Sequence, residues 1–302
     1  MRTVLDPWGC DALRSGAMDN VAILIGVDGG GTGCRARVRA PDGRLLGEGR
    51  GGPANVRLGH GLAWANILSA IDATGIDRAA LPDAAIVLGL AGIVDDAGAN
   101  AMLAAGPGFG RARIVSDGHI ACVGAFGGGD GGVLIVGTGS AAQVVTGGHA
   151  RALFGWGFEI DDRGSGAALG RMAVRAALDA IDGIGPDTPF ITAIRARIGD
   201  GAGAIVTWLG TARPADYGAL APLAFAHRDD PVAATLIART ARQVDAMIAH
   251  MVAVGAPRVA LVGGMAAAIL PWLDATSHDR LDSPAQDATE GALLLAQEIA
   301  GS

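Results

Sequence analysis

Two glycine-rich turns carry residue types whose spacing suits phosphate binding. Residues 25–32 read Ile-Gly-Val-Asp-Gly-Gly-Gly-Thr and residues 135–140 read Ile-Val-Gly-Thr-Gly-Ser, each fed by an apolar, strand-forming run. Glycines let backbone N–H groups approach phosphate oxygens, and hydroxyl groups add further donors. Asp28, at the end of the first strand, can hold Mg²⁺ through water. The predicted nucleotide-binding residues of the two turns are Gly30, Gly31, Thr32, Thr138, Gly139 and Ser140.

Two other phosphate-binding schemes fit these turns less well. A P-loop needs a lysine after its glycines, and the chain contains no lysine at all. A Rossmann turn must open a helix, and residues 137–142 match its G-x-G-x-x-A pattern. The following residues 143–146, however, are rich in β-branched side chains and stop at two glycines, which predicts a hairpin.

Composition limits the class of protein. The chain has 302 residues, of which 50% are hydrophobic and 18% charged, which predicts two domains with large cores. The net charge of −7 without a basic run excludes nucleic acid and anionic membrane as expected partners. Cys10, Cys34 and Cys122 are too scattered for a disulfide framework or a zinc site, so a cytoplasmic protein is predicted.

The apolar stretches are too short to span a bilayer, and residues 1–20 lack the apolar core of a signal peptide. We interpret residues 1–20 as a disordered leader in which Met18 could be the true start. The predicted strands and helices then alternate as in an α/β layer. The expected strands are 21–27, 35–40, 45–49, 85–90, 113–116, 133–136 and 258–262, and the expected helices are 61–74, 165–181, 231–254, 266–273 and 288–300.

A third glycine turn, Gly263-Gly264-Met265, follows the last expected strand and precedes a helix. Such a turn could present donors to an adenosine, so Gly264 and Met265 join the predicted nucleotide-binding residues. Taken together, the three turns resemble the phosphate 1, phosphate 2 and adenosine motifs of the actin/hexokinase/Hsp70 superfamily. Within it the chain is similar to the BadF/BadG/BcrA/BcrD group, from residue 23 to the C-terminal helix.

Four further segments resemble bacterial glucosamine kinases of the GspK type. They are residues 32–37, 161–167, 216–218 and 287–293. The resemblance implies a two-lobed, actin-like ATPase of the α/β class with duplicated ribonuclease H-like domains and a nucleotide cleft between them. It places residues 21–116 and 288–302 in an N-terminal lobe and residues 117–287 in a C-terminal lobe.

The resemblance also implies the catalytic and substrate-binding residues. Asp117 matches the catalytic aspartate, which orients the sugar 6-hydroxyl and takes its proton as the γ-phosphoryl group leaves ATP. Asn55 and Asp162 are expected to contact sugar hydroxyls, and the backbone of Trp156 and Gly157 to approach the sugar. Each residue also has a structural interpretation: a helix cap for Asp117, a turn for Asn55, a surface acidic residue for Asp162 and core packing for Trp156.

The segment 161–167 departs from the N-acetylglucosamine kinase pattern, because Asp161 and Arg163 replace a glycine and a glutamate. We hypothesise that the added Asp161 carboxylate favours the protonated amine of free glucosamine.

The predicted activity is MgATP-dependent phosphorylation of an amino sugar, most simply D-glucosamine, by a chain that could pair as a homodimer. An N-acetylglucosamine kinase, a BadF-type activator using iron–sulfur chemistry at Cys34 and Cys122, and a non-enzymatic sugar sensor remain as alternatives.

Overall fold

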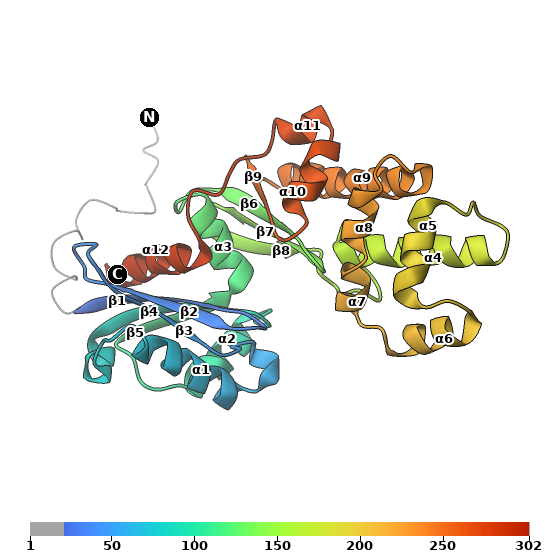
Figure 1. Cartoon of the computed structure of the whole chain (residues 1–302). Helices are drawn as coiled ribbons and strands as arrows, with labels where there is room; N and C mark the ends of the chain where they lie inside the picture. Colours follow the sequence, from blue (N-terminus) through green and yellow to red (C-terminus); the bar gives the residue numbers. More distant parts are fainter. Residues whose placement is uncertain (1–20, 302) are drawn as a thin grey trace, which may run out of the picture. The chain divides into compact units, whose positions relative to one another are not determined.

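The computed structural model describes residues 21–301, and these residues form two compact units (Figure 1). The first unit contains the described residues up to Gly129 together with those from Pro284 onward, and the second unit is Asp130–Ser283. The predicted leader 1–20, with its alternative start at Met18, lies outside the described residues. Within residues 21–301, no helix is long and apolar enough to cross a membrane.

The first unit is built on a five-stranded sheet in the order β3-β2-β1-β4-β5. Strands β1, β2 and β3 pair antiparallel, whereas β1, β4 and β5 pair parallel. Because parallel strands end at the same edge, the ends of β1, β4 and β5 lie side by side. The strands are β1 (Ile23–Gly29), β2 (Cys34–Arg39), β3 (Leu45–Gly51), β4 (Ala84–Leu90) and β5 (Arg111–Ser116).

Helices cover both faces of this sheet, and side-chain alternation along the strands feeds a core on each face. In β1, Ile25 and Val27 pack in the core that contains Trp64 of α1 and Met102 of α2, whereas Leu24 packs on the opposite face with α3 and α12. The elements beside the strands are η1 (Val56–Leu58), α1 (His60–Asp72), η2 (Arg78–Asp83), α2 (Asp96–Ala104), α3 (Asp117–Ala125) and α12 (Ala288–Ala300).

Helices α3 and α12 pack at backbone distance because glycines face the contact. A Cβ atom on Gly124 would lie 2.1 Å from the carbonyl oxygen of Asp287, and one on Gly291 would lie 1.9 Å from that of Ile120. The predicted boundary after Ser116 assigns α3 to the C-terminal lobe. In the structure these contacts instead place α3 in the first unit.

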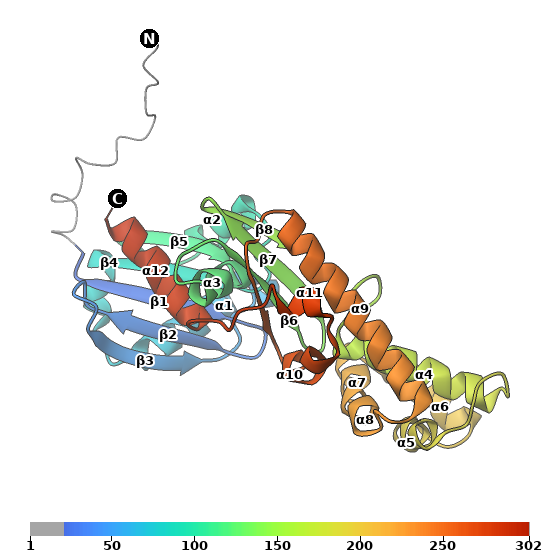
Figure 2. The same ribbon diagram turned by 90° about the horizontal axis from the view of Figure 1, so that it is seen from above.

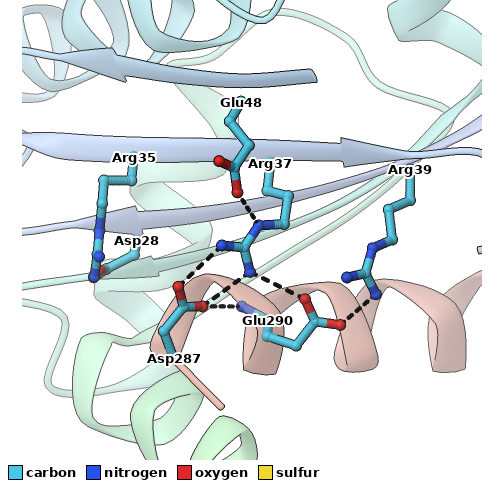
Figure 3. A network of polar contacts seen from close by, with 7 residues as sticks. All are labelled: Asp28, Arg35, Arg37, Arg39, Glu48, Asp287 and Glu290. Carbon is cyan, nitrogen blue, oxygen red and sulfur yellow. Dashed lines mark hydrogen bonds and ion pairs between the residues drawn. The ribbon is translucent and has the colours of Figure 1, made fainter. Parts of the chain in front are cut away.

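An ion network holds the N-terminal end of α12 on the sheet (Figure 3). Asp287 caps the helix by accepting from the Glu290 N–H at 2.8 Å, and it also pairs with Arg37 of β2 at 3.0 Å. Glu290, whose side chain is only 8% exposed, pairs with both Arg37 and Arg39. Glu48 of β3 adds a more exposed contact to Arg37. The network accounts for the two acidic residues of segment 287–293.

The second unit contains a four-stranded sheet in the order β8-β7-β6-β9. Strands β6, β7 and β8 are antiparallel, and β9 runs parallel to β6. The residues after the second glycine turn form strand β7, so the prediction of a hairpin in place of a Rossmann helix is confirmed. The strands are β6 (Gly131–Val136), β7 (Ser140–Thr146), β8 (His149–Leu153) and β9 (Val259–Val262).

Helices make up the rest of the second unit, and two long ones, α4 and α9, pack against each other (Figure 2). The predicted helix 266–273 is wrong in its length: α10 ends at Ile269 and a 3-10 turn follows, because Pro271 lacks the N–H that would continue the helix. The helices are α4 (Gly166–Ile181), α5 (Pro189–Ile198), α6 (Ala202–Thr211), α7 (Pro214–Gly218), α8 (Ala221–Ala226), α9 (Pro231–Ala253), α10 (Ala266–Ile269), η3 (Leu270–Trp272) and α11 (Ala275–His278).

Candidate functional site

The first glycine turn joins β1 to β2 and presents an open backbone. The Gly30 N–H donates to the Gly33 carbonyl at 2.9 Å, and the Gly30 carbonyl accepts from the Ala54 N–H at 3.0 Å. Gly31 is exposed, its φ lies outside the left-handed region, and a Cβ there would meet nothing within 4 Å. Neither backbone conformation nor packing therefore requires glycine at this position, so the absence of a side chain leaves room for an approaching ligand.

Asp28 and Asp117 lie at the same edge of the first sheet, at the ends of β1 and β5, which flank β4. Asp28, near the end of β1, pairs with Arg35 of β2 at 2.7 Å (Figure 3). Asp117 is the first residue of α3, directly after β5. Burial raises the pKa of the Asp117 carboxyl above its ordinary value, and the negative charge of Asp28 raises it further.

The helix-cap interpretation of Asp117 is not what the structure shows. Ser116 caps α3 by accepting from the His119 N–H at 3.1 Å, while Asp117 Oδ1 accepts from the Gly118 N–H at 2.9 Å. His119 itself is buried, and burial, helped by Arg113, lowers its pKa to about 4. His119 is therefore neutral near pH 7, and Asp117 is the candidate proton acceptor at the start of α3.

Asn55 combines a structural contact with a free amide group. Its Oδ1 accepts from the Arg57 N–H at 2.9 Å and thereby caps η1, as the turn interpretation predicts. Within residues 21–301, the Nδ2 group of Asn55 has no hydrogen bond. The side chain can therefore still donate to a ligand hydroxyl while its oxygen holds the loop.

The second glycine turn is closed by the start of α4. The Gly166 N–H donates to the Gly137 carbonyl at 2.7 Å, and the Gly137 N–H donates to the Gly139 carbonyl at 2.9 Å. Thr138 is exposed. Ser140, by contrast, is buried and its hydroxyl donates to the Arg163 carbonyl at 2.8 Å. That hydroxyl proton is already used, so only the Thr138 hydroxyl of this turn is open to a phosphate.

Asp162 connects the second glycine turn to the loop that carries Trp156, Gly157 and Asp162, the residues predicted to contact the sugar. This loop is called the sugar loop below. The backbone N–H groups of Ser140 and Gly157 act to lower the pKa of the Asp162 carboxyl, and a Cβ on Gly139 would lie 2.9 Å from Asp162 Oδ2. Burial raises the pKa of Asp162, and the charge of neighbouring Asp161 adds to this rise. Asp162 also adopts a left-handed φ of 53°, which is uncommon for a residue other than glycine. It is not the surface acid of the structural interpretation.

The Asp161 side chain is only 3% exposed, and its Oδ1 pairs with Arg163 at 2.7 Å. Its other oxygen, Oδ2, is buried without a hydrogen-bond partner among the described residues. Arg163 therefore already neutralises this carboxylate. The hypothesis that Asp161 attracts the protonated amine of glucosamine has less support as a result. Trp156 is 82% exposed, so its interpretation as a core residue is wrong.

The third glycine turn lies beside the second one. Gly263 has a φ of 106° and its missing Cβ would lie 2.4 Å from the Val136 carbonyl, so glycine is required there. Gly264 is open, and its N lies 3.8 Å from where a Cβ on Gly137 would be. Met265 is buried in the core, and its N–H donates to the Val136 carbonyl at 3.0 Å.

The segment 216–218 contributes to the same region in a way that its sequence did not indicate. A Cβ on Gly218 would lie 3.3 Å from Thr138 Cγ2, and one on Gly170 would lie 1.9 Å from the Tyr217 carbonyl. Helix α7 therefore packs against both the second glycine turn and α4. Arg35, the partner of Asp28, was also missed, and strand pairing of residue 28 with residue 35 could have suggested it.

Two α/β units, each with a glycine-rich turn after its first strand, define an actin-like ATPase fold, which confirms the predicted fold class. The chain belongs to the BadF/BadG/BcrA/BcrD ATPase family, whose sequence model matches residues 25–296. Over 278 residues it is 34% identical to glucosamine kinase GspK of Vibrio cholerae, covering 90% of this chain and 95% of that protein.

Solved structures show the same relationship. The crystal structure of a putative N-acetylglucosamine kinase from Chromobacterium violaceum superposes with a TM-score of 0.80 at 34% identity, covering 92% of this chain and 99% of that one. A ROK family glucokinase from Streptomyces griseus superposes with a TM-score of 0.55 at 18% identity, covering 92% of this chain and 99% of that one. The second comparison shows the fold alone.

Proposed function

We propose that this protein transfers the γ-phosphoryl group of ATP to the 6-hydroxyl of an amino sugar, converting D-glucosamine to glucosamine 6-phosphate. The observation that carries the proposal is the Asp117 carboxyl, held at the start of α3 with a raised pKa beside Asp28. A raised pKa brings a carboxylate closer to the basicity that a general base needs near neutral pH. The similarity to glucosamine kinase GspK supports the choice of sugar.

In the proposed reaction the 6-hydroxyl oxygen attacks the γ-phosphorus and the bond to the β-phosphate oxygen breaks, so ADP leaves. Asp117 accepts the hydroxyl proton, and Asn55 and Asp162 orient the ring by hydrogen bonds. The backbone of Trp156 and Gly157 approaches the sugar. Because little covalent chemistry falls to the protein in phosphoryl transfer, positioning and charge stabilisation dominate.

Residues of the three glycine turns are proposed to bind nucleotide. In the first unit these are Gly30, Gly31 and Thr32. In the second unit they are Thr138, Gly139, the Ser140 backbone, Gly264 and the Met265 backbone. The exposed Thr138 hydroxyl and the open Gly264 support these assignments.

Asp28 is proposed to hold the Mg²⁺ that accompanies ATP, through water. Two carboxylates, Asp28 and Asp117, are close enough for one to raise the pKa of the other, and a divalent cation would relieve this repulsion. Arg35 pairs with Asp28 at 2.7 Å and orients that carboxylate. When bound, Mg²⁺ supplies charge neutralisation on the phosphates.

The proposal is tested by measuring ADP release from MgATP with glucosamine, with N-acetylglucosamine, with glucose and without sugar. Turnover with glucosamine that exceeds the other three by at least about tenfold is the expected result; that ratio corresponds to about 1.4 kcal/mol of discrimination. Preference for N-acetylglucosamine would keep the kinase assignment and correct the substrate. ATP hydrolysis at a rate that does not depend on added sugar would overturn the kinase assignment.

Gly31→Ala is expected to raise the KM for MgATP by about tenfold or more without lowering the melting temperature. The added methyl group meets no protein atom within 4 Å, so the fold tolerates it, but it fills the space that the phosphate is proposed to occupy. Steady-state kinetics and thermal unfolding measure the two effects.

The matched control for this variant is Gly203→Ala, because a Cβ at Gly203 also meets nothing within 4 Å but lies in α6 of the second unit. The control should leave the KM unchanged. An unchanged KM in Gly31→Ala itself would remove this turn from the nucleotide site.

The activator alternative has less support than the kinase. It requires cysteine ligands that a cluster can reach, yet Cys34 and Cys122 are both buried, and burial raises the pKa of the Cys34 thiol to about 11. We further propose that the protein is cytoplasmic and forms a homodimer. Light scattering on the purified protein tests the oligomeric state.

A further inference from the structure

A basic cavity of about 750 Å³ lies in the second unit, between helices α4 and α9 and the loop that precedes α4. Arg163 comes from the loop, Arg171 from α4, and Arg239 and Arg242 from α9. Asp161 is the single acidic residue that lines it. None of these four arginines was assigned a role by the proposed reaction.

Three of the four arginines have no carboxylate partner among the described residues. Arg163 pairs with Asp161, but Arg239 and Arg242 make no hydrogen bond or ion pair within residues 21–301. Arg171 donates to the Phe158 carbonyl at 2.9 Å and lies over the Phe158 ring at 4.6 Å. It forms no ion pair in the described part of the chain, although its charge acts to lower the pKa of Asp162. The cavity therefore concentrates positive charge in a protein whose net charge is −7.

Like charges gathered around one concave space give it a positive potential that attracts anions. Guanidinium groups match the geometry of phosphate oxygens and bind them through paired N–H donors. The volume suits a small molecule, and the apolar stretches of Ile160, Ala168 and Met172 on the wall suit the carbon skeleton of such a ligand. We propose that this cavity is a binding site for a phosphorylated small molecule, with the phosphate held by Arg239 and Arg242.

The cavity is also connected to the predicted sugar loop. Gln243 of α9 accepts from the Gly164 N–H at 2.9 Å, and Arg163 holds Asp161, the neighbour of Asp162. A phosphate that draws Arg163 toward the cavity weakens its pairing with Asp161, and the loop that carries Asp162 then changes its position or mobility. Occupancy is therefore expected to change the KM for the sugar more than the KM for ATP; this regulatory part rests on the proposed function, whereas the binding site does not.

The test measures binding directly, without ATP or sugar. The melting temperature is followed while inorganic phosphate, and separately glucose 6-phosphate, is titrated at constant ionic strength against chloride. The wild type is expected to show a saturable rise, and Arg239→Ala/Arg242→Ala is expected to bind at least tenfold more weakly. Arg239→Gln/Arg242→Gln, which keeps more of the side-chain packing, serves as the second variant.

The control variant Arg175→Ala/Arg228→Ala removes the same number of exposed arginines from the second unit, but neither residue lines the cavity. It should bind phosphate like the wild type, as should a variant of Asp117, whose site is in the other unit. No saturable shift in the wild type, or an equal shift in the Arg239 and Arg242 variants, would overturn the site.

Light scattering on the same samples tests whether a second copy of the chain, and not a small molecule, occupies the cavity. A change of oligomeric state in Arg239→Ala/Arg242→Ala, with phosphate binding unchanged, would assign the arginines to a contact between two copies and overturn the proposal. If the wild type binds phosphate in this cavity but shows no kinase activity, the proposed function is wrong and the phosphate site is still supported.

Discussion

Asp117→Asn is expected to lower kcat for glucosamine phosphorylation by about 10²- to 10⁴-fold while raising the melting temperature at neutral pH. The loss of activity follows because the amide cannot accept the 6-hydroxyl proton. The gain in stability follows because burial and the charge of Asp28 both raise the pKa of Asp117, so its ionised form is less favourable in the folded state than in the unfolded state.

The stability gain has a defined pH dependence. A carboxyl whose pKa is raised on folding binds more protons in the folded state, so its contribution to stability falls as pH rises from its unfolded pKa through its folded pKa. Asp117→Asn should therefore match the wild type in acid, where both are neutral, and exceed it at pH 7. Thermal unfolding across this range, with kcat measured in parallel, makes the comparison.

Asp96→Asn is the control for this change, because Asp96 is likewise the first residue of its helix, α2, but is exposed. It should change neither kcat nor the pH dependence of stability appreciably. A variant of Asp117 that keeps its activity would show that another group takes the proton. Lower stability at pH 7 would contradict the electrostatic argument.

Glu290→Ala is expected to reduce the free energy of unfolding by on the order of 3 kcal/mol. The substitution leaves Arg37 and Arg39 without the carboxylate that pairs with both, and Arg39 Nε is already buried without a hydrogen-bond partner among the described residues. Removing one member of a buried ion network costs more than the network contributes as a whole, because uncompensated charges remain. Equilibrium unfolding in urea measures the change.

The same network supplies the control for this prediction, since Glu48 forms an ion pair with Arg37 alone among the described residues and its side chain is 55% exposed. Glu48→Ala should cost less than about 1 kcal/mol. Comparable losses in the two variants would mean that burial of Glu290 is not the source of the effect. A larger loss in Glu48→Ala would reverse the proposed order of importance.

The central strands were predictable because they are short, apolar and closely followed by glycine, whereas the exposed strand β8 was not predicted. The runs that became β1, β4 and β6 were predicted to within about two residues, and the break after Gly139 distinguished a hairpin from a Rossmann helix. Helices α5 to α8 were not predicted, because their segments are short, from five to ten residues, and they are held together mainly by tertiary packing.

The position of α3 shows a limit of a different kind. The predicted boundary lies after β5, at Ser116, but the contacts that assign α3 to the first unit come from α12, far along the sequence. Similarly, Ser140 has a side chain of the right chemistry for phosphate binding. Only the structure shows that its hydroxyl donates to the Arg163 carbonyl.

The return of α12 to the first sheet constrains how the chain folds during synthesis. Arg37 and Asp287 are 250 positions apart, and the whole second unit lies between the two stretches that make the first. During synthesis the complete second unit therefore leaves the ribosome before α12 emerges. Until then, the face of β1 and β4 that α12 covers remains uncovered by it. The first unit matures last although most of it is made first, and its exposed apolar face in the interval is where a nascent-chain chaperone would be needed.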